Sequence, residues 1–586
     1  MKEFFKYVLA TMVGVFLIWI VIYIMSVFMI LSISSASEAT PSIKNNSILK
    51  ISLSGVIEER AMENPFAFLN DDVLKRQGLD DLLHAIDVAA ENDDIKGIYI
   101  EAGALSADFA TLQELRKALQ RFREDTDKFI CSYGDNYTEG AYYVCSVANS
   151  VILNPIGMLD WHGIASQPIF YKDVLDKLGI KMQVFKVGTY KSAVEPYILT
   201  QMSEANREQV QSFVSDIWNV MCQEVSLSRK VSLDSLNAYA DRYTALAQAE
   251  EYKKMKLVDA TMYIDGVRDF LRSKLGEKKV NFVAASQLAK LWEPGSRGDG
   301  SIVVYVAEGN IVDEVAEGFS METQIVGQKV VEDIDRMTND ENVKAVVLRI
   351  NSGGGSAYAS EQMWRAIQLL KEKKPVVVSM GGLAASGGYY MSCGANYIVA
   401  EPTTLTGSIG IFGMVPDLSG LLTEKIGLHF DVVKTNKASD FGAMGRGFNA
   451  EEGQAMQTYV DRGYLLFLER VAAGRKMKKE AVDSIAQGRV WTGNQAKKIG
   501  LVDELGNLEA AILKAAELAG VSSYAVLYSP APPSMFDFLL DMRKEGYMER
   551  EIRQIMGVYY EPISFLRQTE HGGYLQARML YAPNLK

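Results

Sequence analysis

The sequence predicts an α/β protein that contains a tandem repeat of one unit, preceded by a transmembrane helix. Three observations lead to this prediction: an uncharged apolar run near the N-terminus, apolar strands that alternate with amphipathic helices, and an internal repeat spaced by about 248 residues. The chain has 586 residues, which exceeds the length of one ordinary domain. We therefore expect at least two domains.

The N-terminal segment predicts a membrane anchor. No charged residue lies between Tyr7 and Ser37, and this run exceeds the roughly 20 residues that cross a bilayer. Two lysines precede the run and Glu38 follows it, so the positive-inside rule places the N-terminus in the cytoplasm and the rest of the chain outside. A cleaved signal peptide is the alternative, but the apolar region is longer than signal peptides carry. We expect an uncleaved anchor over 1–40.

The internal repeat is visible in three pairs of matching segments. Both copies contain short apolar strands followed by amphipathic helices, which indicates stacked α/β layers. The paired segments are IDVAAENDDIKGIYIE (86–101) with IDRMTNDENVKAVVLR (334–349), GAYYVCSVAN (140–149) with GGYYMSCGAN (387–396), and KKMKLVD (253–259) with KKIGLVD (497–503).

Composition shifts suggest where the domains begin and end. We place the first copy at 50–265 and the second at 302–515. The segment 266–301 is expected to be a linker, because its end, KLWEPGSRGDGS, is rich in Gly, Pro and polar residues. The segment 516–586 is expected to be a C-terminal extension that is partly helical, since a proline-rich breaker is followed there by an amphipathic pattern.

Each copy has kept a chemical group that the other copy lacks. Aligning the Tyr-Tyr pairs places Glu139 opposite Ser386, while a slip of one residue would substitute Thr138. The glycine cluster NSGGGS of the second copy corresponds to GALSAD in the first copy. Conversely, Lys191 of the first copy aligns with Ser439 of the second copy. This pattern favours one site that is built from both copies over two independent sites.

Composition also excludes several classes of function. A net charge of −12 and a pI near 5.2 offer no basic face, so we expect no nucleic-acid partner. The glycine clusters lack the phosphate-loop pattern GxxxxGK[ST], and the four cysteines lack metal-ligand spacing, so we expect no metal and no cofactor. None of the four histidines lies in a segment with candidate catalytic residues, which weakens a Ser-His-Asp interpretation. These histidines are His84, His162, His429 and His571.

Four motifs, VGTYKSAVEP, RINSGGGS, AASGGYY and TGSIGIFG, together resemble the long, tandem-repeat form of the signal peptide peptidase A family. The resemblance extends from the anchor to about residue 515. It implies two domains with a crotonase-like or Clp-protease-like fold, and a serine protease with a Ser-Lys dyad. In this family the serine of AASGG is the nucleophile and the lysine of GTYKSA is the base, which correspond to Ser386 and Lys191. The sequence departs from the family at Gly353, where proline is usual.

The resemblance also implies the remaining parts of the site. Two backbone amides would stabilise the oxyanion: that of Gly387, which follows the nucleophile, and that of Gly355, with Gly354 as the neighbouring alternative. Ser408 would hydrogen-bond the lysine amine and orient it, and a local turn is the alternative role for this serine. Glu139 is expected to serve packing or a polar contact.

The proposed chemistry requires a buried lysine. A serine hydroxyl becomes a good nucleophile only when a base removes its proton, and lysine can act as that base only in its neutral form. An exposed lysine has a pKa near 10.4 and is almost wholly charged at pH 7, whereas burial lowers this value by several units. We therefore expect Lys191 to lie in an apolar pocket.

The function that we expect is that of a membrane-anchored serine endopeptidase. Its expected substrates are apolar peptides, above all cleaved signal peptides that remain in the membrane. The resemblance implies a homotetramer in the bacterial inner (cytoplasmic) membrane, single-pass, with the catalytic domain on the periplasmic side. Two alternatives are a crotonase-like acyl-CoA enzyme and a non-catalytic membrane scaffold.

Overall fold

The computed structural model describes residues 43–60, 76–296, 298–314, 323–531 and 576–579, with a few single residues between 6 and 24. Among these residues, no helix is both long and apolar enough to span a bilayer. Most of the predicted anchor over 1–40 lies outside the described residues, and so does most of the predicted C-terminal extension. The predictions for these two segments stay predictions.

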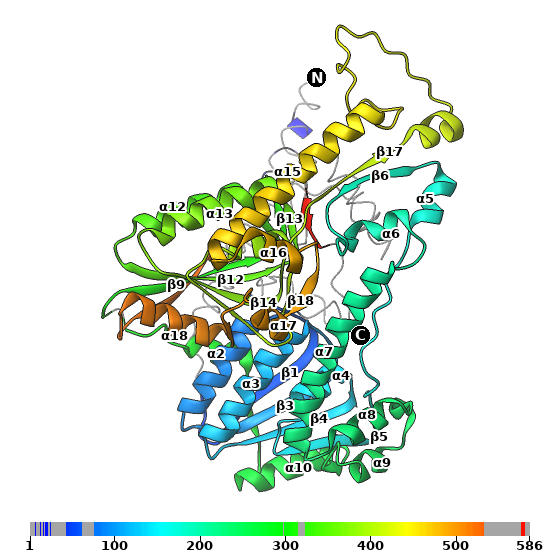
Figure 1. The fold of residues 1–586 in the computed structure, drawn as a ribbon. Helices are drawn as coiled ribbons and strands as arrows, with labels where there is room; N and C mark the ends of the chain where they lie inside the picture. The colour runs from blue at the N-terminus through cyan, green and yellow to red at the C-terminus, as the bar shows by residue number, and fades with distance from the viewer. Residues whose placement is uncertain are drawn as a thin grey trace.

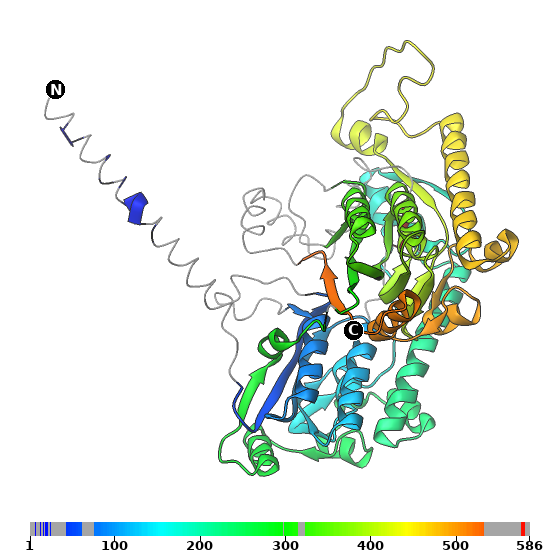
Figure 2. The ribbon, with the colours of Figure 1, turned by 90° about the vertical axis from the view of Figure 1, so that its left-hand side faces the viewer.

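The first copy of the repeat is a parallel sheet with helices on both faces, drawn in blue, cyan and green in Figures 1 and 2. Among the described residues the strand order is β2-β1-β3-β4-β5-β7, and β8 pairs with β1 beside this path. The apolar runs of these strands are buried from both sides, as parallel sheets require. The strands are β1 (Ser47–Glu58), β2 (Arg76–Gly78), β3 (Ile95–Ser106), β4 (Phe129–Tyr137), β5 (Ser150–Leu159), β7 (Ala260–Thr261) and β8 (Asn281–Ala284).

Helices of the first copy cover the two faces of its sheet unequally. Several helices share the larger hydrophobic core on one face, whereas Val267 and Leu271 of a single helix, α10, pack on the opposite face. The helices of this half of the chain are α2 (Leu79–Glu91), α3 (Phe109–Asp125), α4 (Glu139–Cys145), α5 (Lys172–Leu178), α6 (Glu195–Ile198), α7 (Glu204–Arg229), α8 (Leu233–Ala240), α9 (Ala249–Lys254), α10 (Ile264–Leu275) and α11 (Ala285–Leu288).

The second copy repeats this arrangement above the first copy (Figure 1). Its described strands follow the order β18-β16-β14-β12-β9-β20, and β15 and β19 continue from β14. All of these pairs are parallel except β16 with β18. The strands are β9 (Ser301–Glu308), β12 (Val343–Ser352), β14 (Val376–Ala385), β15 (Tyr397–Ala400), β16 (Leu405–Gly407), β18 (Val490–Thr492), β19 (Glu504–Leu505) and β20 (Ala525–Ser529).

The helices of the second copy match those of the first. Leu508 and Ala511 of α18 cover one face of the sheet, as α10 does in the first copy, while the other helices share the core on the opposite face. The predicted α/β repeat is therefore present. These helices are α12 (Gly327–Asn339), α13 (Ala357–Lys371), α14 (Gly387–Ser392), α15 (Ala450–Arg475), α16 (Lys479–Ile485), α17 (Gly493–Lys498) and α18 (Leu508–Ala519).

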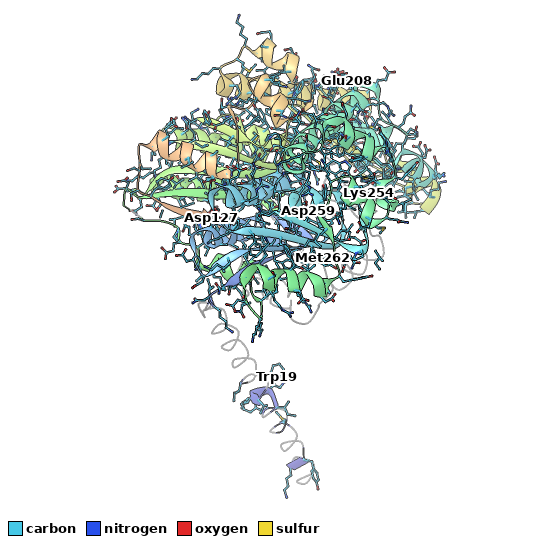
Figure 3. All side chains as sticks on the ribbon, turned by 90° about the horizontal axis from the view of Figure 1, so that it is seen from below. Trp19, Asp127, Glu208, Lys254, Asp259 and Met262 are labelled. Carbon is cyan, nitrogen blue, oxygen red and sulfur yellow. The ribbon has the colours of Figure 1, made fainter. Side chains whose placement is uncertain are left out.

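Equivalent contacts hold the same elements together in both copies. Arg229, at the end of α7, forms two hydrogen bonds of 2.8 and 3.0 Å with Asp259, whose side chain also accepts one from the Val151 amide (Figure 3 labels Asp259). In the second copy Arg475 of α15 forms the same pair with Asp503, at 2.6 and 3.0 Å. The paired segments KKMKLVD and KKIGLVD are therefore alike because each supplies the aspartate of this contact.

The domain boundaries differ from the predicted ones. Strand β8 adds to the edge of the first sheet as β20 adds to the edge of the second, so each copy extends beyond the predicted ends at 265 and 515. The predicted linker over 266–301 therefore begins too early, since most of its first half belongs to α10 and β8. These two strands have only four and five residues, which is too short for the periodicity of the sequence to separate them from loops.

A third sheet joins the two copies. Its strand order is β11-β10-β13-β21-β17-β6 among the described residues. Strand β6 of the first copy pairs in antiparallel fashion with β17 of the second over six residues (Figure 1). The strands are β6 (Lys181–Lys186), β10 (Asn310–Val312), β11 (Gln324–Val326), β13 (Gly354–Ser356), β17 (Phe412–Asp417) and β21 (Gln576–Arg578).

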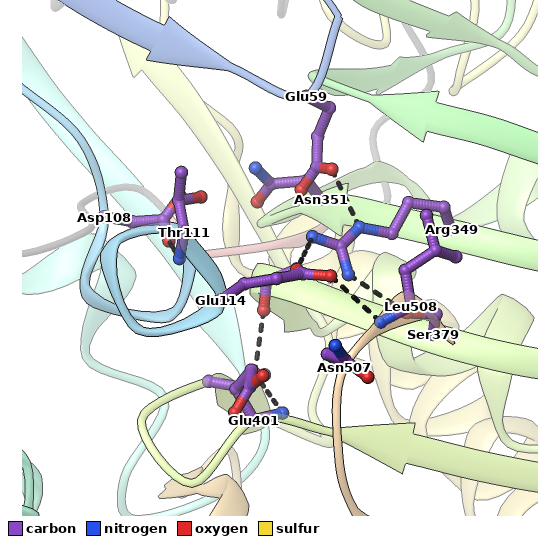
Figure 4. Close-up of polar contacts among 12 residues, drawn as sticks. Glu59, Asp108, Thr111, Glu114, Arg349, Asn351, Ser379, Glu401, Asn507 and Leu508 are labelled. Atoms are coloured by element: carbon purple, nitrogen blue, oxygen red, sulfur yellow. Dashed lines mark hydrogen bonds and ion pairs between the residues drawn. The ribbon is translucent and has the colours of Figure 1, made fainter. Parts of the chain in front are cut away.

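A buried polar network also connects the two copies (Figure 4). Arg349 in β12 donates hydrogen bonds of 2.7 Å to Glu59 and to Glu114 of the first copy, and one of 3.0 Å to Ser379. Burial raises the pKa of the Glu59 carboxyl, and the charge of Arg349 opposes this shift. Because removing one member of a buried ion pair leaves the other charge uncompensated, loss of any of these charged side chains would destabilise the contact between the copies.

Candidate active site

Ser386 lies at a sharp turn between β14 and α14. Its backbone angles, φ 55° and ψ −112°, belong to a region that residues other than glycine rarely adopt. Two backbone hydrogen bonds of 2.8 Å hold this conformation: the Ser386 amide donates to the Gly407 carbonyl, and the Ser386 carbonyl accepts from the Tyr390 amide. The turn therefore places a buried hydroxyl at the N-terminus of α14.

Lys191 reaches this hydroxyl from the first copy. It follows β6, and its Nζ donates a hydrogen bond of 2.8 Å to the Oγ of Ser386. The same amine donates to the Oγ and to the carbonyl oxygen of Ser408, both at 3.1 Å. The structure therefore brings the three predicted side chains together, although Lys191 and Ser386 are 195 positions apart in the chain.

The surroundings of the amine favour its neutral form. The Lys191 side chain is 1% exposed, and among the described residues no carboxylate contacts it. Burial alone lowers the pKa of Lys191 to about 7. At neutral pH a large fraction of this lysine therefore carries the lone pair that a general base needs.

Two glycines that the sequence analysis did not single out make room for Lys191. A Cβ atom on Gly488, which has φ +79°, would lie 2.7 Å from the Cα of Lys191. A Cβ atom on Gly410 would lie 3.2 Å from the lysine Cδ. Gly410 belongs to the motif TGSIGIFG, so the sequence motif could have identified it. Gly488 lies in the segment AQGRV, which matches no motif, so the sequence could not have identified it.

The loop that carries one predicted oxyanion glycine lies against the helix that begins with the other. Gly387 is the first residue of α14, and Gly355 lies in β13. A Cβ atom on Gly354 would lie 2.5 Å from the amide nitrogen of Gly387, so the NSGGGS loop lies directly against the start of α14. The amide of Gly354 donates to the Oγ of Ser352 at 3.1 Å. This contact favours Gly355 over Gly354 as the second oxyanion donor.

Comparison with known proteins places the chain in a family. Residues 122–278 and 368–522 both match the model of peptidase family S49. The chain belongs to peptidase family S49. It is 37% identical to Protease 4 of Salmonella typhi over 92% of this chain and 88% of that protein. It is also 33% identical to Protease 4 of Haemophilus influenzae over 91% of this chain and 90% of that protein.

These matches confirm the predicted family and enzyme class: the S49 peptidase is a serine protease with two S49 repeats. Among solved structures, ClpP1 from Listeria monocytogenes aligns with 35% of this chain and 91% of that chain. The identity is 17% and the TM-score is 0.22. Within the part of the chain that the structure describes, no group of three or more His, Cys, Asp or Glu side chains is placed to hold a metal ion.

In the first copy of the S49 peptidase, Glu139 occupies the position that aligns with Ser386, and it has a different role. Tyr142 and Tyr389 each donate to a leucine carbonyl at 2.9 Å, which supports the register that pairs Glu139 with Ser386. The Glu139 carboxylate is buried and accepts hydrogen bonds of 3.0 Å from the amides of His162 and Gly163. It therefore fixes the loop that follows β5, in agreement with the expected polar contact.

Proposed function

We propose that Ser386 of this S49 peptidase attacks peptide bonds and that Lys191 is its general base. The observation that supports this proposal is the 2.8 Å hydrogen bond between the two side chains, combined with a lysine pKa of about 7. No histidine takes part in the contacts that the structure gives Ser386 and Lys191. A Ser-Lys pair therefore accounts for the serine protease chemistry of this family.

The mechanism follows from the contacts of the amine. Neutral Lys191 accepts the hydroxyl proton of Ser386 while the Oγ forms a bond to the carbonyl carbon of the peptide. Ser408, which contacts the same amine, keeps the lone pair directed at Ser386. The lysine then gives the proton to the departing amine, and a water molecule hydrolyses the acyl-enzyme by the same proton route.

The oxyanion of the tetrahedral intermediate meets the amides of Gly387 and Gly355. Both are backbone donors whose positions are set before the substrate binds, and the N-terminus of a helix adds a favourable field. Loss of one such donor commonly lowers the rate by a factor of about 10² to 10³.

Labelling with a fluorophosphonate probe distinguishes the candidate functions. The probe should modify Ser386 in the parent protein, because the base activates this hydroxyl, and it should not modify the Ser386→Ala variant. Ser439 occupies the position of the second copy that aligns with Lys191. The Ser439→Ala variant is therefore a matched control, and it should be labelled like the parent. An acyl-CoA enzyme or a scaffold would leave Ser386 unlabelled in an intact protein, and this result would contradict the proposal.

The proposed substrates are apolar peptides at the membrane, with cleaved signal peptides as the main class. The uncharged run from Tyr7 to Ser37 supports this, because an anchor keeps the active site beside peptides that stay in the bilayer. The charges that flank the run support a bacterial inner membrane location with the catalytic domain on the periplasmic side. The family resemblance supports a crotonase-like or Clp-like fold and a homotetramer.

Protease accessibility tests the proposed topology. A protease added to the periplasmic side of the inner membrane should cleave exposed loops of the catalytic domain, such as the one around Val433, and should leave the first six residues protected. Cleavage of the catalytic domain only from the cytoplasmic side would reverse the orientation.

The solution mass of the detergent-extracted protein tests the proposed homotetramer. It should equal the mass of four chains, and a monomer mass would contradict the tetramer.

A further inference from the structure

Helix α7 of the first copy runs along β18 and α17 of the second copy (Figure 1). Three of its side chains, spaced by three and four residues, share one helix face and hydrogen-bond to these elements. The contacts are Gln209 with the Val490 amide at 3.2 Å, Ser212 with Gln495 at 3.0 Å, and Asp216 with Thr492. This face of α7 therefore forms a polar seam between the two copies.

Gln209 also holds the segment that carries Lys191. Its Nε2 donates hydrogen bonds of 3.1 Å to the carbonyl oxygen of Tyr190 and of 2.9 Å to the Oγ of Ser192. These two residues come directly before and after Lys191 in the chain. Gln209 is buried, so water does not compete for these hydrogen bonds. One amide group therefore holds the backbone around Lys191 from both sides.

The other end of the Gln209 amide contacts the second copy beside the pocket of Lys191. Its Oε1 accepts the hydrogen bond from the Val490 amide, and the preceding carbonyl, that of Arg489, accepts one of 2.7 Å from the Ser408 amide. Ser408 in turn contacts the Lys191 amine through its own Oγ. Gln209 therefore connects the segment that carries the lysine to the segment that orients the lysine amine.

The two contacts require both ends of a carboxamide. A backbone carbonyl only accepts a hydrogen bond and a backbone N–H only donates one, so Tyr190 needs a donor and Val490 needs an acceptor. A glutamate would lack the donor, and an apolar side chain would lack both groups. Asn206 supports the same orientation, because its Oδ1 accepts a hydrogen bond of 3.1 Å from the Nε2 of Gln209.

The position of the Lys191 backbone matters because the side chain beyond it is long. Its Nζ must stay 2.8 Å from the Oγ of Ser386, and a displacement of about 1 Å in an active site can lower a rate by a factor of about 10². Any movement toward water would also favour the charged form of the amine, which cannot act as a base.

We propose that Gln209 is a positioning residue that keeps Lys191 within reach of Ser386 and out of water. This inference rests on the proposed function, and Gln209 acts through Lys191 without contacting the reacting atoms. When its amide is removed, the groups on both sides of Lys191 lose their shared donor. The amine then moves away from Ser386 and toward solvent, so proton transfer becomes slower and less of the lysine is neutral at pH 7.

The Gln209→Met variant tests the inference, because methionine keeps much of the length and volume of the side chain while it removes the donor and the acceptor. At pH 7 kcat on an apolar peptide should fall about tenfold or more, with KM little changed. The midpoint of the profile of kcat/KM against pH should move above about 7, toward the pKa of an exposed lysine.

Two further variants separate positioning from general stability. Ser212→Ala removes a hydrogen bond from the same seam without touching the Lys191 segment, so it should keep the kcat and the midpoint of the parent. Ser192→Ala removes one of the two contacts around Lys191, and it should move the midpoint in the same direction by a smaller amount. If Gln209→Met does not fold, Ser192→Ala decides alone, and an unchanged midpoint there would overturn the inference.

The shape of the pH profile distinguishes the possible outcomes. A purely structural role of Gln209 would lower activity by the same factor at every pH and leave the midpoint in place, which would overturn the inference. Parent-like kinetics in Gln209→Met, or the same shift in Ser212→Ala, would overturn it as well. These results leave the proposed function standing as long as the parent cleaves the peptide and is labelled at Ser386. A parent without labelling or peptidase activity would contradict both.

Discussion

Replacement of Ser386 by alanine is expected to abolish peptidase activity and to lower kcat/KM by a factor of about 10⁴ or more. Lys191→Ala should have a loss of similar size, because the hydroxyl without its base is a poor nucleophile. The double variant should be hardly worse than either single variant, since the two groups act as a unit. The measurement is hydrolysis of an apolar peptide by the purified variants.

Two controls show whether this loss comes from the chemistry of the pair: the stability of the variants, and the removal of a lysine on the strand that precedes Lys191. The melting temperature and solution mass of both variants should show that the fold and the assembly persist. Lys181→Ala, at the exposed start of β6, removes a lysine ten residues before Lys191 and should leave turnover unchanged. Substantial turnover in folded Ser386→Ala or Lys191→Ala would refute the assignment of the pair.

Sequence patterns were sufficient for the main architecture and for the central pair. Buried parallel strands such as KAVVLRI and amphipathic helices of similar length recur in both copies, so a repeat of α/β type followed from periodicity. The pairing of Lys191 with Ser386 followed from what each copy lacks, together with the family resemblance. The structure brings the two side chains into contact, and the catalytic role of this contact stays a prediction until it is tested.

The third sheet, which joins the two copies, and the glycines around Lys191 could not be predicted from local patterns. Strands β6 and β17 are too short and too far apart in the chain for periodicity to pair them. Gly488 matters because it has no side chain that would clash with Lys191, and its local sequence does not show that its backbone packs against Lys191. The C-terminal segment was predicted to be partly helical, yet its described residues 576–578 form a strand, because the unpaired edges of two distant strands determine their conformation.

The pH dependence of catalysis follows from the state of Lys191. Its pKa is lowered to about 7 by burial, and the neutral form is the active base, so kcat/KM should rise as pH increases through about 7 and then level off. A histidine base would give a similar midpoint, so the profile alone does not identify the base. Burial lowers the pKa of His84 to about 4, whereas a hydrogen bond that the His162 imidazole donates to the Glu139 carboxylate raises the pKa of His162.

Substitution of Lys191 by arginine separates the two bases. Arginine keeps the positive charge and much of the length of the side chain, but it stays protonated throughout the accessible pH range. The Lys191→Arg variant should therefore be inactive at every pH, with a loss as large as that of Ser386→Ala. Removal of a histidine should leave the rising part of the profile in place.

The most direct test of the Ser-Lys pair is kcat/KM on an apolar peptide from about pH 5 to about pH 10. It is measured for the parent, for Lys191→Arg, and for four variants that each replace one histidine. We expect a rise with a midpoint near 7 in the parent and in all four histidine variants, and no activity in Lys191→Arg. Activity in Lys191→Arg, or loss of the rise in a folded histidine variant, would contradict the Ser-Lys mechanism.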